Sequence, residues 1–184
     1  SDPMLEKAAA SDQARWLDAL LLRLLRVYKY KEAAVFISKF EKAISSGAFL
    51  NKGQYKFRCQ VYSAWIHFEQ DNDELAVEYA ENAIGMGNLD NRFYLKALLI
   101  KGFVLLSKGK PVDSVISQID IYKENYVSKE TGPNGSKECD LLKFAKDVLN
   151  NSPDLPKFWL SLSLRAQEYY VDAYSERIRN ILTH

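Results

Sequence analysis

The chain has 184 residues, of which 47% are hydrophobic, so it is long and apolar enough to fold around a core. It carries 25 basic and 24 acidic residues, and this balance argues against a dedicated nucleic-acid binder. No apolar run approaches the roughly 18 residues that a membrane span requires. Two cysteines, Cys59 and Cys139, are too few for a disulfide framework or a zinc site.

The first residues resemble a remnant of tag removal. Ser1, Asp2 and Pro3 precede Met4, so we expect Met4 to be the native start and residues 1–4 to lie outside the fold. No charged segment is followed here by an apolar one, as a secretory signal would require. The expected location is therefore intracellular, either cytoplasmic or nuclear, with reduced cysteines.

Helical periodicity runs through most of the chain, which has only 8 Gly and 5 Pro. Ser11 is the expected N-cap of the first helix, whose apolar stripe includes Trp16, Leu21 and Val27. Gly47 ends the second helix. No segment has the pattern of a strand, so the sequence predicts an all-α fold. The predicted helices cover residues 12–29, 31–45, 53–70, 74–84, 92–107 and 111–122.

The composition of the chain changes after these helices. Residues 128–137 are polar and rich in turn formers, which predicts a flexible loop. Helices are expected over 137–149 and 156–182, and the second of these is dense in aromatic residues. Residues 138–184 are therefore predicted to form a helical hairpin that caps the domain. Its long last helix could also lie in a groove of its own chain or pair with another subunit.

The first six helices form three pairs of the same shape. Ala64 and Gly102 lie midway along the first helix of the second and third pairs, whereas the first pair has Leu21 there. A small residue also lies near the start of the second helix of each pair. These residues are Ala33, Ala76 and Ser114. This pattern resembles the tetratricopeptide repeat, in which small residues lie where the two helices pack closely.

The resemblance covers about residues 12–125 and is to a divergent member of the family. The small-residue anchors are 43 and 38 residues apart, whereas the family period is about 34. The family implies a right-handed α-solenoid of three helix pairs over residues 5–127. An ungrouped set of helical hairpins with similar packing is the alternative.

Signals for catalysis are weak. His67 is the only internal histidine and is expected to pack on its helix, and Cys59 has no suggestive neighbour. The glycines at 85–87 and 132–137 lack the spacing and the preceding strand of nucleotide-binding loops, so they indicate turns. We therefore expect no enzyme activity, no cofactor and no metal site.

The tetratricopeptide resemblance implies a concave groove lined by the first helix of each pair. The small-residue anchors place a basic row and an apolar row on that face. The basic row is Arg15, Arg58 and Lys96, and the apolar row is Leu22, Trp65 and Phe103. Such a face suits a peptide or helix with apolar anchors and acidic flanks. We expect Trp65 and Phe103 to be solvent-exposed in the free protein, unless they pack between neighbouring repeats.

The sequence predicts a non-catalytic adaptor or scaffold subunit that binds a segment of a partner protein through this groove. No membrane insertion is expected, and a nucleic-acid partner is disfavoured by the charge balance. Two alternatives stay open. One is an RNA-binding helical-repeat module, because the N-terminal third is biased toward Lys and Arg. The other is an oligomeric structural subunit, which could be a homo- or hetero-oligomer formed through the C-terminal helix.

Overall fold

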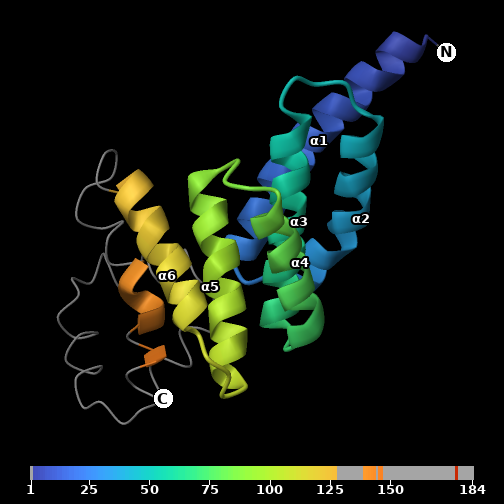
Figure 1. Ribbon diagram of the computed structural model, residues 1–184. Coiled ribbons are helices and arrows are strands. Elements are labelled where there is room, and N and C mark those ends of the chain that lie inside the picture. The colour runs from blue at the N-terminus through green and yellow to red at the C-terminus, as the bar shows by residue number, and fades with distance from the viewer. Residues whose placement is uncertain (1, 128–138, 144, 147–176, 178–184) are drawn as a thin grey trace. The chain divides into compact units, whose positions relative to one another are not determined.

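The computed structural model describes residues 2–127, 139–143, 145–146 and 177, and every regular element in these ranges is helical (Figure 1). The all-α prediction is confirmed for this part of the chain, which contains no strand. Residues 139–143 and 145–146 are also helical. The elements are α1 (Pro3–Arg26), α2 (Tyr30–Ser46), α3 (Lys52–Glu69), α4 (Asp73–Gly85), α5 (Asn91–Ser107), α6 (Asp113–Tyr122) and a π-helical turn (Lys123–Val127).

The start of α1 differs from the prediction. The helix begins at Pro3, and its N-cap is Asp2, whose carboxylate accepts a hydrogen bond from the Met4 amide at 2.9 Å. Ser11 was expected as the N-cap but lies buried within the helix. Its hydroxyl accepts a hydrogen bond from the backbone N–H of Ala48 at 3.0 Å and so ties α1 to the segment after α2.

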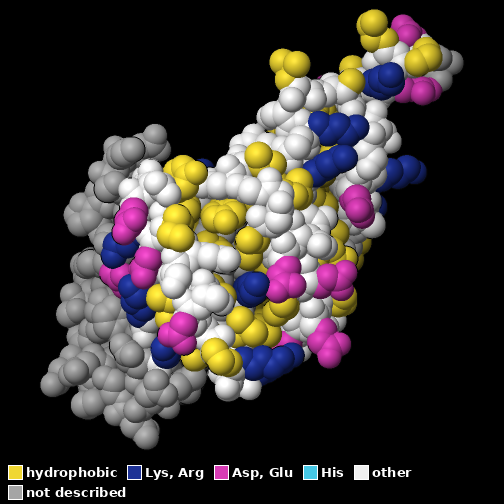
Figure 2. Space-filling view, viewed as in Figure 1, with side chains coloured by type: hydrophobic (Ala, Val, Ile, Leu, Met, Phe, Trp, Pro, Cys, Tyr) yellow, Lys and Arg dark blue, Asp and Glu magenta, His cyan; other side chains and the backbone are white. Residues whose placement is uncertain are grey.

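The N-terminal end of α1 extends past the ends of α2 and α3 (Figure 1). All residues from 2 to 9 are exposed, and Figure 2 shows hydrophobic, acidic and basic side chains together on this projecting end. The apolar stripe predicted for α1 is also partly wrong. Trp16 is 60% exposed and Val27 is 53% exposed, whereas Leu21 is fully buried.

The second to sixth predicted helices are confirmed, with ends that differ by one or two residues. The sixth was expected to start at Pro111 but starts at Asp113, after the N-cap Val112. Ser114 was expected at a close helix crossing and is exposed instead. Val115, the next residue, is 1% exposed and takes the inward position. In the third pair the small-residue anchor is therefore wrong.

The chain divides into two compact units, Ser1–Ala97 and Leu98–His184, and the division falls within α5. In the first unit α3 is central, because it packs against α1, α2 and α4. Aromatic side chains pack around Tyr62 of α3. Its ring lies edge-on to the Phe93 ring, with 5.4 Å between the centroids, and 6.1 Å from the centroid of the Phe40 ring. Ala76, Ala80 and Ala83 are fully buried on α4, so their small size lets α4 lie close to α3.

In the second unit, Gly102 allows a close approach to the helical segment 139–143. A Cβ atom at Gly102 would collide with the side chain of Leu142, which is fully buried. The sequence pattern marked Gly102 as a close-packing position of its helix pair, and the close contact that the structure shows is with Leu142 instead. Two ion pairs join the same segment to the preceding elements: Lys143 with Asp120 at 2.8 Å, and Lys123 with Asp140 at 2.9 Å.

Some predictions lie outside the described residues. These are the flexible loop over 128–137, the helix over 156–182 and the cap formed by the C-terminal hairpin. The corresponding domain boundary stays a prediction. Within the described ranges, no helix has both the length and the apolar content that crossing a bilayer would require.

His67 is a packing residue, as predicted, and its ring packs against the neighbouring helix α4. Its ring stacks on Tyr79 with 5.5 Å between centroids and parallel planes, and its Nδ1 atom is buried with no hydrogen-bond partner in the described chain. Burial lowers the pKa of His67 below its ordinary value of 6.5, because the charged ring loses solvation.

Acidification should therefore destabilise the protein through His67. Below pH 6.5 the unfolded state binds the proton more readily than the folded state, so the free energy of unfolding falls as the pH falls. His67→Phe keeps a ring against Tyr79 and removes the titration. Urea unfolding between about pH 7 and about pH 5 should show a flatter profile for this variant than for the natural sequence. Parallel profiles would contradict the assignment.

Candidate functional site

Arg58 is an internal ion-pair residue of the first unit. Its Nη1 atom donates to Asp18 Oδ2 at 2.6 Å, and its Nη2 atom donates to Asp90 Oδ2 at 2.7 Å. The Arg58 side chain is 22% exposed, and the two carboxylate side chains are 14% and 11% exposed. One guanidinium thus links α1, α3 and the segment before α5. The predicted role of Arg58 in meeting acidic residues of a partner has no support in this geometry.

The same network explains two shifted pKa values. Burial acts to lower the pKa of Arg58, but its hydrogen bond to Asp90 and the charges of Asp18 and Asp90 raise it overall. Tyr62 donates a hydrogen bond to Asp18 at 2.8 Å, and its pKa is raised by burial and by the Asp18 charge. Arg58 therefore stays charged and Tyr62 stays neutral at neutral pH, and the network is a structural one.

Trp65 and Lys96 are packed against each other inside the first unit. The Lys96 ammonium lies 3.2 Å from the centre of the Trp65 ring, which is a cation–π contact. Trp65 is 4% exposed and Lys96 is 5% exposed. The expectation that Trp65 is solvent-exposed is wrong, because α5 brings Lys96 over the ring.

The remaining predicted residues differ in their exposure. Arg15 is 60% exposed at its side chain and pairs with Asp12, also on α1, at 2.8 Å. Leu22 is half-buried on α1. Phe103 belongs to the second unit and is 1% exposed, so its expected exposure is also wrong. The predicted basic and apolar rows are thus mostly packing positions, while their partner-binding role stays a prediction.

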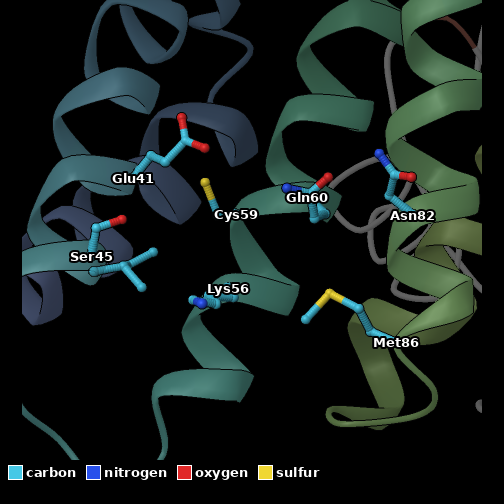
Figure 3. A pocket seen from close by; sticks show the side chains of 8 residues that line it. Glu41, Ser45, Lys56, Cys59, Gln60, Asn82 and Met86 are labelled. Atoms are coloured by element: carbon cyan, nitrogen blue, oxygen red, sulfur yellow. The ribbon is translucent and has the colours of Figure 1, made fainter.

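A different surface of the first unit is hollowed. A groove of about 500 Å³ lies between α2, α3 and α4, and Figure 3 shows α2 on one side, α3 behind and α4 on the other side. Polar and apolar side chains share its lining. The residues that line this α2–α4 groove are Glu41, Ile44, Ser45, Lys56, Cys59, Gln60, Asn82 and Met86.

Cys59 lies at the back of the α2–α4 groove and is 4% exposed. Figure 3 shows its thiol and the Glu41 carboxylate pointing toward one another. Burial raises the pKa of Cys59 to about 12, and the Glu41 charge adds to this shift. The thiol is therefore protonated at neutral pH and is a weak nucleophile. Its contribution to the groove is a small apolar surface.

Two carboxamides, two opposite charges and the Ser45 hydroxyl supply the polar lining. Gln60 on α3 and Asn82 on α4 each offer an N–H donor and a carbonyl acceptor. The Gln60 Oε1 atom is buried and accepts no hydrogen bond within the described residues. Glu41 on α2 and Lys56 on α3 are both exposed. This set can hydrogen-bond both an N–H and a carbonyl of one ligand.

The sequence patterns did not lead to this groove. It lies between the second helices of two pairs, whereas the family resemblance directed attention to the first helices. One signal was present: Gln60 lies on the central helix α3 directly between two buried residues, Cys59 and Val61. A polar side chain there indicates a surface that is only partly covered.

Within the described ranges, no cluster of three or more His, Cys, Asp or Glu residues is placed to hold a metal ion. The α2–α4 groove is therefore the candidate site on the basis of shape and hydrogen-bonding capacity. Comparison of the chain with protein-family models, with curated proteins and with solved structures gives no match.

Proposed function

We propose that this chain is a non-catalytic adaptor that binds an extended segment of a partner protein in the α2–α4 groove. The observation that carries the proposal is the groove itself, an open volume of about 500 Å³ walled by three helices. This volume lies within the range of about 300–1,000 Å³ that is typical of ligand sites. The lining has the mixed character that a polypeptide requires, since a peptide presents polar backbone and apolar side chains together.

The expected ligand follows from the lining. Gln60 and Asn82 can hydrogen-bond the N–H and C=O groups of an extended backbone, which leave an isolated strand unpaired. Ile44, Cys59 and Met86 offer an apolar floor for one side chain of modest size. Lys56 and Glu41 can meet an acidic and a basic residue of the segment. The groove thus replaces the predicted concave face around Trp65 as the proposed contact.

The finer architecture belongs to the same proposal. Pairs of antiparallel helices, with small residues at Ala33 and Ala76 buried where each pair packs, support a tetratricopeptide-like solenoid. A solenoid offers such grooves because each helix pair contacts only its neighbours and leaves furrows between them. An adaptor needs no reactive group, which agrees with a protonated Cys59.

Filling the groove should abolish binding of a segment that docks there. Peptides selected from a random displayed library against the full chain provide the ligand, and fluorescence anisotropy measures the affinity. Asn82→Trp places a large ring in the groove and should weaken binding at least about tenfold. Glu74→Trp is the matched control, because Glu74 is exposed on the same helix and does not line the groove. The control variant should bind normally.

The same measurements separate the alternatives. Binding in the groove should depend weakly on salt, whereas an RNA-binding module would lose affinity steeply as salt increases. Equal affinity of the Asn82→Trp variant and the natural sequence would contradict the groove proposal. A library that yields no peptide, together with salt-sensitive binding of single-stranded RNA, would favour the RNA-binding alternative.

A further inference from the structure

The outer face of α1 is a seam of six exposed residues that is not used by the groove. These positions are spaced alternately by three and four residues, as in the contact seam of a coiled coil. The opposite face of α1 packs on α2 and α3 through buried Leu17, Leu21 and Leu25. The α1 seam consists of Ala9, Asp12, Trp16, Ala19, Arg23 and Arg26.

We propose that the α1 seam binds the α1 seam of a second copy of this chain, with the two helices antiparallel. The charge pattern of the α1 seam indicates that its partner is a second copy of the same seam. Asp12 lies in the N-terminal half of the seam, and Arg23 and Arg26 lie in the C-terminal half. An antiparallel pair with its two-fold axis midway between Trp16 and Ala19 places Asp12 of each copy opposite Arg23 of the other.

The sizes of the side chains fit the same register. Trp16 of one copy lies opposite Ala19 of the other, so a large ring meets a small residue at the centre. Ala9 lies opposite Arg26, whose aliphatic stem can cover it. A parallel pair in register would instead oppose Trp16 to Trp16, and Asp12 to Asp12. Like charges at both ends disfavour that arrangement.

The seam is open to a second helix. Trp16 is 60% exposed, and within the described residues Arg23 and Arg26 form no ion pair. Asp12 pairs with Arg15 across one turn, with both side chains more than half exposed, and a surface pair of this kind exchanges partners at little cost. The helix is about 36 Å long, and its first turns project beyond α2 and α3, so a neighbouring helix meets no obstruction there.

Sedimentation equilibrium of the full chain tests the pairing. The natural sequence should show a concentration-dependent dimer, and Trp16→Glu should raise its dissociation constant at least about tenfold. Val35→Glu is the matched control, because Val35 is 62% exposed on α2 and lies outside the seam. A chain that stays monomeric at every concentration, or a dimer unchanged by Trp16→Glu, would overturn the proposal.

Charge exchange tests the register. Asp12→Arg alone and Arg23→Asp alone should each weaken the dimer, since each opposes like charges. The double variant restores opposite charges at both ends and should recover the dimer. Failure of the double variant to recover, with circular dichroism showing that it is folded, would contradict the proposed register.

Cross-linking tests the direction of the helices. Variants Ala9→Cys and Arg26→Cys, mixed under mild oxidation, should form a disulfide with each other. In the antiparallel pair the two copies of position 9 would lie about 25 Å apart, so Ala9→Cys alone should not cross-link. The natural cysteines, Cys59 and Cys139, are 4% and 1% exposed and should not interfere. Cross-linking of Ala9→Cys to itself would show a parallel pair and overturn the proposal.

Discussion

Trp65→Ala should destabilise the protein by about 3–5 kcal/mol, the usual cost of removing a large aromatic side chain from a core. Trp65 is 4% exposed on α3, the helix that packs against α1, α2 and α4. The substitution leaves a cavity and removes the ring beneath the Lys96 ammonium, which lies 3.2 Å from its centre. Urea unfolding followed by circular dichroism measures the loss, and an intact midpoint would show that Trp65 is not a core residue.

Two companion variants separate volume from electrostatics. Trp65→Phe keeps an aromatic ring and removes the indole N–H, which is buried without a hydrogen-bond partner in the described chain. It should cost less than the alanine substitution, since an unpaired buried donor is itself unfavourable. The double variant Trp65→Ala with Lys96→Met should be less destabilised than the sum of the single changes. That difference measures the cation–π coupling.

Arg58→Met should destabilise the first unit by about 3 kcal/mol, because it leaves two largely buried carboxylates without their shared cation. Asp18 and Asp90 come from different parts of the chain and are 14% and 11% exposed at their side chains. Arg58 is the cation that joins both carboxylates to α3, while the Tyr62 hydroxyl gives Asp18 a second, neutral contact with the same helix. Arg58→Lys should recover only part of the loss, since an ammonium cannot present the planar fork that reaches both carboxylates. Urea unfolding measures both variants.

The exposed pair on α1 provides the control for Arg58. Arg15 and Asp12 are joined at 2.8 Å, but their side chains are 60% and 76% exposed. Arg15→Met should therefore change stability by less than about 0.5 kcal/mol. Combining Arg58→Met with Asp18→Asn and Asp90→Asn should restore much of the stability, because no unpaired charge remains. Equal effects of Arg15→Met and Arg58→Met would contradict the distinction between a surface pair and a buried network.

Helical periodicity in the sequence was sufficient to predict the fold class and the extents of most helices. Leucines and aromatic residues recur at helical spacing, and glycines such as Gly47 and Gly109 mark the ends of helices. The start of α1 was predicted wrongly because serine is a common N-cap residue, so Ser11 was expected to begin the helix. Its hydroxyl is instead used across space by Ala48, a contact that no local pattern records.

The candidate site could not be predicted from the sequence for a physical reason. Helical spacing fixes which residues share a face, but it does not say what covers that face. From the sequence, Arg58 and Lys96 were expected on a basic surface. In the structure two carboxylates neutralise Arg58, and the Trp65 ring lies against Lys96. The spacing of Trp16 predicted a core residue, but its side chain is exposed in the structure. The α2–α4 groove is lined by residues of three different helices, so it forms only when those helices come together in the fold.

For the described residues, the sequence by itself thus determined the all-helical fold, the turns between the first six helices and the small residues at the closely packed positions Ala33, Ala76 and Gly102. These are consequences of short-range stereochemistry and of side-chain volume, which the residue order contains directly. Only the tertiary structure decided which charged and aromatic side chains are internal. Their burial depends on partners distant in sequence, such as Asp18 and Asp90 around Arg58, and long-range contacts of this kind leave no periodic trace in the chain.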